Sequence, residues 1–254
     1  MTRRFTLTGL IVTLVFGVFI TASNGQLRDS TPRFKAGVDL VSLDVCVRDG
    51  SGRFVPDLSA EDFNHRATRV HTFGEDPSHV PTALSSSIGA IVSSADFGTG
   101  STALYDALLV AANEVTRARG GALPETREVV VLLSDGEDTS SRVGFEEVLP
   151  VLRRSGALVY SVSLQANERG EWLGAPWPML ALTRDTGARA QGVPTLDALP
   201  GLYREIVTEV RHLYRLAYVS NDTRPDGRWR TISVRIPSRD ARVRTRAGYY
   251  APRP

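Results

Sequence analysis

The sequence contains a single cysteine, Cys46, so no disulfide can form within the chain. The fold must therefore be held together by its hydrophobic core. Cys46 falls within an alternating pattern in which Val41, Leu43, Val45 and Val47 are separated by polar residues, as in a strand with one solvated face. This setting favours a small packed residue over a nucleophile.

Neither sign of charge dominates the chain. Lys and Arg number 30 against 28 Asp and Glu, a formal net charge of +2. Without Arg3 and Arg4, which lie in a segment expected to be removed, the charge is 2 − 2 = 0, so there is no basic footprint for nucleic acid. Arginine is dense between residues 228 and 246, but Arg242, Arg244 and Arg246 alternate with small or apolar residues. This pattern predicts the solvated face of a strand rather than a nucleic-acid surface.

Motifs that carry common enzyme chemistry are also missing. The four histidines show no metal-ligand spacing such as His-x-x-x-His, and no Gly-x-Ser-x-Gly elbow occurs. Gly98-Thr-Gly100 lacks the third glycine and the lysine of a phosphate-binding loop. We therefore expect that the protein is not an enzyme; the alternative is a hydrolase.

No apolar run reaches the ~20 residues of a membrane span. The longest, Leu7 to Ile20, follows Arg3-Arg4 and precedes the small, polar run Thr21 to Gln26. Residues 1–25 are thus predicted to be a secretory signal peptide, with an uncleaved anchor as the alternative. Cleavage predicts an exported protein (periplasmic, cell-surface or secreted) of roughly 230 residues, without a membrane span and with room for one large or two small domains.

The most informative stretch runs from Glu128 to Thr139. Its apolar run, Val129 to Leu133, is too short for a helix and too uniform for a half-exposed strand, which predicts a strand buried on both faces of a parallel sheet. Asp135 then follows the carboxyl end of that strand, where open α/β sheets bind ligands. The alternative interpretation is that Asp135 only caps a loop or the next helix.

Helices and strands alternate around this run. Apolar periodicity predicts helices from Thr102 to Ala118, from Val143 to Arg154, around Met179 to Arg184, and from Leu196 to Tyr214. Thr102 or Ser101 is expected to cap the first helix, and Pro150 to kink or shorten the second. Extended pieces are predicted at residues 157–164, 214–219, 229–236 and 243–250, whereas 74–101 reads as loop except for Ile88 to Val92. Trp172 and Trp177 either plug a core edge or form a contact surface.

Several segments resemble the von Willebrand factor type A domain, and most closely the exported VWFA-related proteins of Acidobacteria. They are Gly100-Ser-Thr-Ala-Leu-Tyr-Asp-Ala-Leu108, Val129 to Ser140, Val38 to Val55, Leu58-Ser-Ala-Glu-Asp-Phe63, Tyr214 to Tyr218 and Arg246 to Tyr250. The resemblance implies a doubly wound α/β sheet, here shortened, flanked by β segments that pack together. It divides the chain into a signal peptide (1–25), an amino-terminal β segment (26–75), a partial von Willebrand A-like domain (76–213) and a carboxyl-terminal β segment (214–254).

The resemblance also implies a metal-ion-dependent adhesion site for Mg²⁺, in which Thr102 matches the family's threonine and Asp135 its aspartate. The family's Asp-x-Ser-x-Ser motif is absent between Phe73 and Thr102. That interval of some 28 residues is also too short for the strands and helix that the family carries there. We therefore expect a degenerate site that binds Mg²⁺ weakly or not at all, in a chain that is either a truncated member of the family or the product of a gene model that has lost a piece.

The functional expectation is an exported, non-enzymatic binding or adhesion module that engages another protein or a surface polymer near Asp135. The alternative is a metal-free structural or assembly scaffold, or a truncated paralogue without function.

Overall fold

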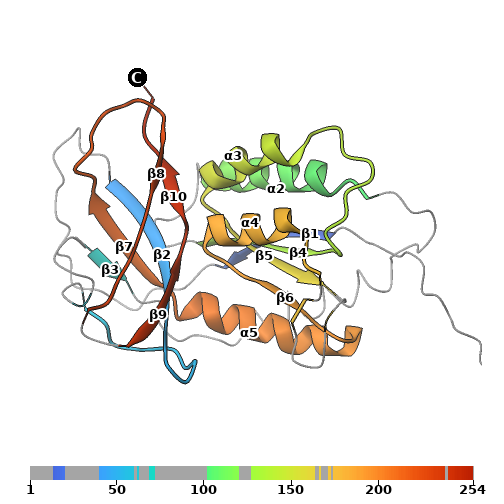
Figure 1. The fold of residues 1–254 in the computed structure, drawn as a ribbon, viewed down its shortest axis with the longest axis horizontal. Coiled ribbons are helices and arrows are strands. Elements are labelled where there is room, and N and C mark those ends of the chain that lie inside the picture. Colours follow the sequence, from blue (N-terminus) through green and yellow to red (C-terminus); the bar gives the residue numbers. More distant parts are fainter. Residues whose placement is uncertain are drawn as a thin grey trace, which may run out of the picture.

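The computed structural model describes residues 14–20, 40–59, 62, 69–71, 102–119, 127–163, 166, 171–172, 174–237 and 240–253. The predicted loop at 74–101, with its candidate strand Ile88 to Val92, lies outside them. The described strands form a sheet in the order β1-β4-β5-β6, a sheet in the order β3-β7-β2-β9, and the pair β10-β8. Figure 1 shows the helices gathered around the first sheet, with the other strands beside it.

The first sheet has a parallel core. β4 (Arg127–Leu133), β5 (Leu158–Ser163) and β6 (Ala190–Gly192) run parallel, joined through α3 (Phe145–Ser155) and α4 (Trp177–Thr186). β4 is buried along nearly its whole length, which explains its uniformly apolar sequence. The predicted mixed α/β fold with a parallel sheet is confirmed.

The fourth strand of this sheet was not predicted. β1 (Leu14–Ile20) pairs antiparallel with β4 over seven residue pairs, from Leu14 with Leu133 to Ile20 with Arg127. The apolar pattern of this segment was assigned to a signal peptide, whose removal remains a prediction. In the chain before any cleavage, β1 satisfies backbone groups along a β4 edge that would otherwise be open. Among the described residues, no helix is long and apolar enough to cross a membrane.

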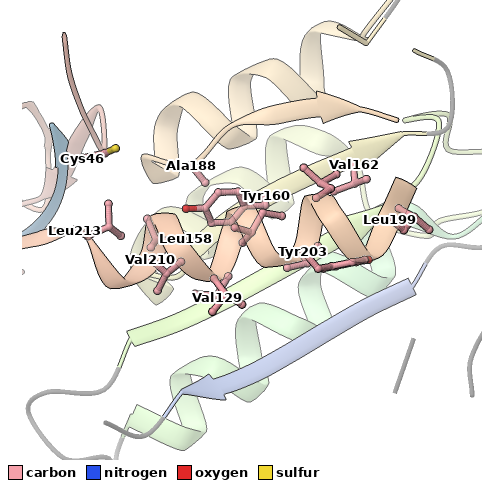
Figure 2. Close-up of a cluster of buried hydrophobic side chains, with 14 of the residues drawn as sticks. Cys46, Val129, Leu158, Tyr160, Val162, Ala188, Leu199, Tyr203, Val210 and Leu213 are labelled. Carbon is pink, nitrogen blue, oxygen red and sulfur yellow. The ribbon is translucent and has the colours of Figure 1, made fainter. Parts of the chain in front are cut away.

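Helices cover both faces of the sheet because successive side chains of β4 point to opposite sides. Val130 and Leu132 pack with α3, α4 and α2 (Leu104–Arg119). Val129 and Val131 pack with α5 (Leu199–Arg211), which follows the short helical turn η2 (Leu196–Ala198). Figure 2 shows Tyr160 and Leu158 of β5 facing Tyr203 and Val210 of α5. Two separate clusters of buried side chains thus anchor the central strand.

Two helices differ in detail from their predicted form, for local chemical reasons. Pro150 does not end α3, which continues to Ser155 and stops at Gly156 in a left-handed conformation. Of the two predicted effects of Pro150, shortening does not occur, since both ends of the helix carry favourable charges and Val148, Leu149 and Leu152 are buried; a kink stays a prediction. The helix predicted from Leu196 begins as a 3₁₀ turn, with Pro200 at the start of α5, where a missing N–H costs nothing.

The remaining strands form a second unit, here called the β unit. β2 (Leu40–Asp49) pairs antiparallel with β7 (Tyr214–Val219) and β9 (Ala241–Thr245), and β3 (Arg69–His71) pairs with β7. β8 (Trp229–Thr231) and β10 (Gly248–Tyr250) form the separate pair. Cys46 is buried in β2, as its pattern predicted, and burial raises the pKa of its thiol.

The β unit packs against the amino-terminal edge of the parallel strands. Arg127, the first residue of β4, donates to Asp44 of β2 at 2.9 Å and to the Leu213 carbonyl after α5 at 2.8 Å. The Gly187 turn that ends α4 fits closely against the backbone of Arg246: a Cβ on Gly187 would lie 2.6 Å from that nitrogen. These contacts occupy one edge of the sheet and leave the carboxyl edge, where β4 and β5 end, clear of the β unit.

A buried carboxylate also joins the two units. Glu209 of α5 is 1% exposed; it accepts from the Tyr160 hydroxyl at 2.7 Å and from Arg48 at 3.1 Å, and it pairs with Arg189 and Arg244. The expectation that Arg244 lies on a solvated strand face was therefore wrong. Strand alternation could not reveal that this face lies against α5 and a buried anion.

Candidate functional site

The candidate site lies at the free carboxyl edge of the sheet, where the segment before α2 meets the loop after β4. The Thr102 carbonyl accepts from the backbone N–H groups of Thr139 at 2.9 Å and Ser140 at 3.0 Å. In return, the Thr102 N–H donates to the Thr139 hydroxyl at 2.7 Å. Thr102 is 4% exposed, so these bonds form in a largely buried setting. Segments more than 30 residues apart are thus joined into one rim.

Asp138 provides the cap of α2. Its Oδ1 accepts from the N–H of Leu104 at 2.7 Å and of Tyr105 at 3.3 Å, and the Ser141 hydroxyl accepts from Tyr105 and Asp106. The sequence predicts Thr102 or Ser101 as the cap of this helix, and Ser101 lies outside the described residues. Because helical geometry begins at Leu104, the flanking residue is Ala103, whose methyl group cannot accept a hydrogen bond, and the acceptors come from the other loop instead.

Asp135 lies in a turn of its own. Its Oδ1 accepts from the Glu137 N–H at 3.0 Å, and the Ser134 hydroxyl accepts from the Gly136 N–H at 3.0 Å. Gly136 has a φ of +86°, and a Cβ there would lie 2.8 Å from Cγ of Pro176, just before α4. Only glycine fits this bend against α4. Asp135 is therefore held half-buried at the edge by loop geometry.

The start of α3 belongs to the same rim. Glu147 accepts from the Gly144 N–H at 3.1 Å, and Asp106 of α2 accepts from the N–H groups of Arg142 at 3.1 Å and Val143 at 3.2 Å. Carboxylates thus satisfy helix N-termini on both sides of the loop. Burial and the nearby charge of Asp138 raise the pKa of Tyr105.

The structure brings the Thr102 and Asp135 segments to one edge, but the hydrogen bonds of Thr102 run to residues 139–140, and the Asp135 carboxylate bonds within its own turn. Sequence reasoning missed Asp138, Asp106 and Ser141 as the groups that hold the rim. A signal was present: Asp138 follows Asp135 by three residues in a Ser/Thr-rich loop, a composition typical of caps.

The described residues at this edge offer few oxygens that are free to face Mg²⁺. Octahedral Mg²⁺ needs oxygen ligands at about 2.0–2.1 Å, several of them free to face the ion. Asp138 is already committed to the amides of α2, and one oxygen of Asp135 to Glu137. Within the described ranges, no group of three or more His, Cys, Asp and Glu side chains is placed to hold a metal.

With this geometry in view, the chain can be compared with known families. Residues 57–175 match the family model of the von Willebrand factor type A domain. The matched von Willebrand A segment contains Thr102, Asp106, Asp135 and Asp138, and it begins earlier and ends earlier than the predicted range of 76–213. Searches of curated proteins and of solved structures gave no significant match. Von Willebrand A domains generally mediate protein interactions or adhesion.

We predict that Asp138→Ala loosens the rim. The amides of Leu104 and Tyr105 lose their acceptor, which should cost about 1–2 kcal/mol of unfolding free energy, the usual range for a lost cap. Hydrogen exchange should show faster exchange at residues 104–106 and 139–141. Asp138→Asn, which keeps a side-chain oxygen, should lose much less; equal losses in the two variants would contradict the capping role.

Proposed function

We propose that this protein is an exported, non-enzymatic binding module that engages another protein or a surface polymer at the carboxyl edge of its sheet. The observation that carries the proposal is the ordered rim within the von Willebrand A segment, where the residues before α2 are hydrogen-bonded to the loop that contains Asp135 and Asp138. The β unit packs against the opposite edge, and Glu137, Thr139 and Ser140 of the rim are exposed. The Arg3-Arg4 start and the apolar run to Ile20 support export.

We further propose that the family's metal site is degenerate in this chain, because the Asp-x-Ser-x-Ser motif is absent between Phe73 and Thr102 and that interval is short. Thr102 and Asp135 remain as its candidate ligands. Any cation held by these two residues alone would depend mostly on water for its coordination.

Calorimetry tests the metal proposal. Titration of Mg²⁺ into the full chain should give no saturable heat below millimolar concentrations, with the same trace for Asp135→Ala. The reason is that too few oxygens are free to replace the ion's hydration shell. Micromolar binding by the wild-type chain that disappears in Asp135→Ala would show that the site is intact after all.

A metal-free assembly scaffold is the second candidate, and the pairing of β1 with β4 favours it. If residues 1–25 are removed at export, β4 loses its antiparallel neighbour along seven residue pairs. An open edge of an apolar strand promotes association with other strands. A scaffold would therefore assemble through β4, whereas a binding module would act through the rim.

The binding proposal is tested by capture from an extract of exported proteins of the source cells. The wild-type full chain and two variants are immobilised in parallel. Leu180→Asp changes a side chain of α4 that is 47% exposed, next to the rim, and Val219→Asp changes one in the β unit that is 41% exposed. A specific partner should be retained by the wild type and by Val219→Asp but lost by Leu180→Asp. A partner retained by Leu180→Asp and lost by Val219→Asp would move the binding surface to the β unit.

A further inference from the structure

An exposed apolar surface borders the rim. Trp177 and Leu180, one turn apart on α4, are 60% and 47% exposed. The Trp177 ring packs edge-on against the Phe145 ring, with ring centroids 5.2 Å apart. The ring centroids of Phe145 and Tyr105 are 6.1 Å apart. We call Tyr105, Phe145, Trp177 and Leu180 the aromatic rim. It joins the first turns of α2, α3 and α4, and its exposed members offer the kind of anchor that interface cores use.

The aromatic rim lies within a negatively charged edge. Residues 102–106 and 134–147 contain six acids and one base, Arg142; the acids are Asp106, Asp135, Glu137, Asp138, Glu146 and Glu147. Asp106, Asp138 and Glu147 already serve helix N-termini, whose partial positive charge offsets some of theirs. In the described part of the chain, none of the six is paired with an Arg or Lys side chain.

The acids and the aromatic side chains are neighbours. Glu146 follows Phe145, and Asp106 follows Tyr105. Asp135 and Glu137 flank Gly136, which touches Pro176 immediately before Trp177. With six acids and one base, the edge carries a net negative charge that attracts cations and repels carboxylates. A bound divalent cation would offset only part of that charge.

We propose that the aromatic rim docks a cationic segment of a partner protein, in which Lys or Arg side chains flank an apolar anchor, and that no metal takes part. The apolar anchor would pack on Trp177 and Leu180 while the cations face Asp135, Glu137 and Glu146. Opposite charges speed association and impose salt dependence, and a cation over the Trp177 ring adds attraction. This inference rests on the proposed binding function and specifies the partner's chemistry.

The test uses two labelled peptides with the same leucine- and phenylalanine-containing centre, flanked either by lysines or by glutamates. Fluorescence anisotropy with the full chain should show the lysine peptide binding at least about tenfold more tightly than the glutamate peptide. Raising NaCl from about 50 to about 500 mM should weaken that binding about tenfold, since the Debye screening length falls to a few ångströms. Exchanging EDTA for Mg²⁺ should change nothing.

Variants assign the interaction to the surface. Trp177→Ala should weaken lysine-peptide binding about tenfold, as for a lost aromatic anchor. Asp135→Asn/Glu137→Gln/Glu146→Gln should remove the preference for lysine, whereas Val219→Ala should leave both affinities unchanged. Circular dichroism melts confirm that each variant folds before its affinity is read.

Two outcomes overturn the inference. Preferential binding of the glutamate peptide in Mg²⁺ would establish a metal-mediated site for acidic partners. Failure of both peptides to bind, while the exported partner is still captured in a Leu180-dependent way, would reject the cationic segment and leave the binding function standing. If the Leu180-dependent capture is also lost, both the cationic segment and the binding function are rejected.

Discussion

Replacing Glu209 by Ala should destabilise the protein by about 3–5 kcal/mol, the usual cost of removing one partner from a buried ion pair. Glu209 is 1% exposed and faces Arg48, Arg189 and Arg244, while the Tyr160 hydroxyl donates to it at 2.7 Å. Without the carboxylate, three guanidinium groups repel one another, and a buried hydroxyl loses its acceptor. For a chain of this size the midpoint of thermal unfolding should fall by roughly 10 °C.

Two controls keep this result specific. Glu205→Ala changes the same helix, but Glu205 is largely exposed and meets Arg189 only at 3.4 Å, so its removal should cost less than about 1 kcal/mol. Glu209→Gln preserves the shape and one acceptor but removes the charge, and should fall between the two. Chemical denaturation followed by tryptophan fluorescence gives the free energies. A loss below about 1 kcal/mol for Glu209→Ala would show that the cluster does not join the two units.

Replacing Asp44 by Ala should destabilise the protein by a similar amount, about 3–5 kcal/mol, because it removes the carboxylate that accepts from the buried Arg127 and from Arg215. The Arg127 side chain is 3% exposed and donates to Asp44 at 2.9 Å, and Arg215 donates to the same oxygen at 3.1 Å. Replacing the arginine as well, in Asp44→Ala/Arg127→Met, should recover part of the loss, because the buried Arg127 guanidinium that donates to Asp44 is then removed too, while Arg215 still loses its acceptor. A double variant as unstable as the sum of both single variants would contradict a direct ionic coupling.

The cost of Asp44→Ala should depend on pH. Burial alone would raise the pKa of Asp44, but the charges and hydrogen bonds of Arg127 and Arg215 outweigh it and hold this pKa below the ordinary value of 3.8. The ion pairs therefore contribute fully above about pH 4 and lose their contribution as the pH falls through the folded-state pKa. The difference in unfolding free energy between the wild type and Asp44→Ala, measured from pH 7 to pH 2, should become smaller only at the acid end of this range.

The elements near β4 were predictable because local pattern and tertiary environment agree there. Val129 to Leu133 are apolar since both faces of the strand are covered, and Gly156 and Gly187 end helices in the left-handed conformation that glycine favours. Trp172 packs against a core cluster, as one of the two predictions has it. Trp177 is exposed on α4, and its role in a contact surface stays a prediction.

The groups that hold the site were not predictable in the same way, because their partners are distant in sequence. Asp138 caps a helix that begins 34 residues earlier, and Glu209 pairs with Arg48, 161 residues away. Local periodicity gives the secondary structure of each partner but not which carboxylate meets which donor. The strand β1 was hidden for a different reason: its apolar run matches a signal peptide as well as a strand.

The most direct test of the binding edge is a photo-cross-linking scan in the source cells. A benzophenone amino acid replaces one exposed residue at a time in the full chain: Glu137 and Leu180 at the rim, Val219 and Arg228 in the β unit. The account predicts one saturable protein adduct from positions 137 and 180 and none from positions 219 and 228. The same adduct from the β-unit positions, with none from the rim, would contradict it.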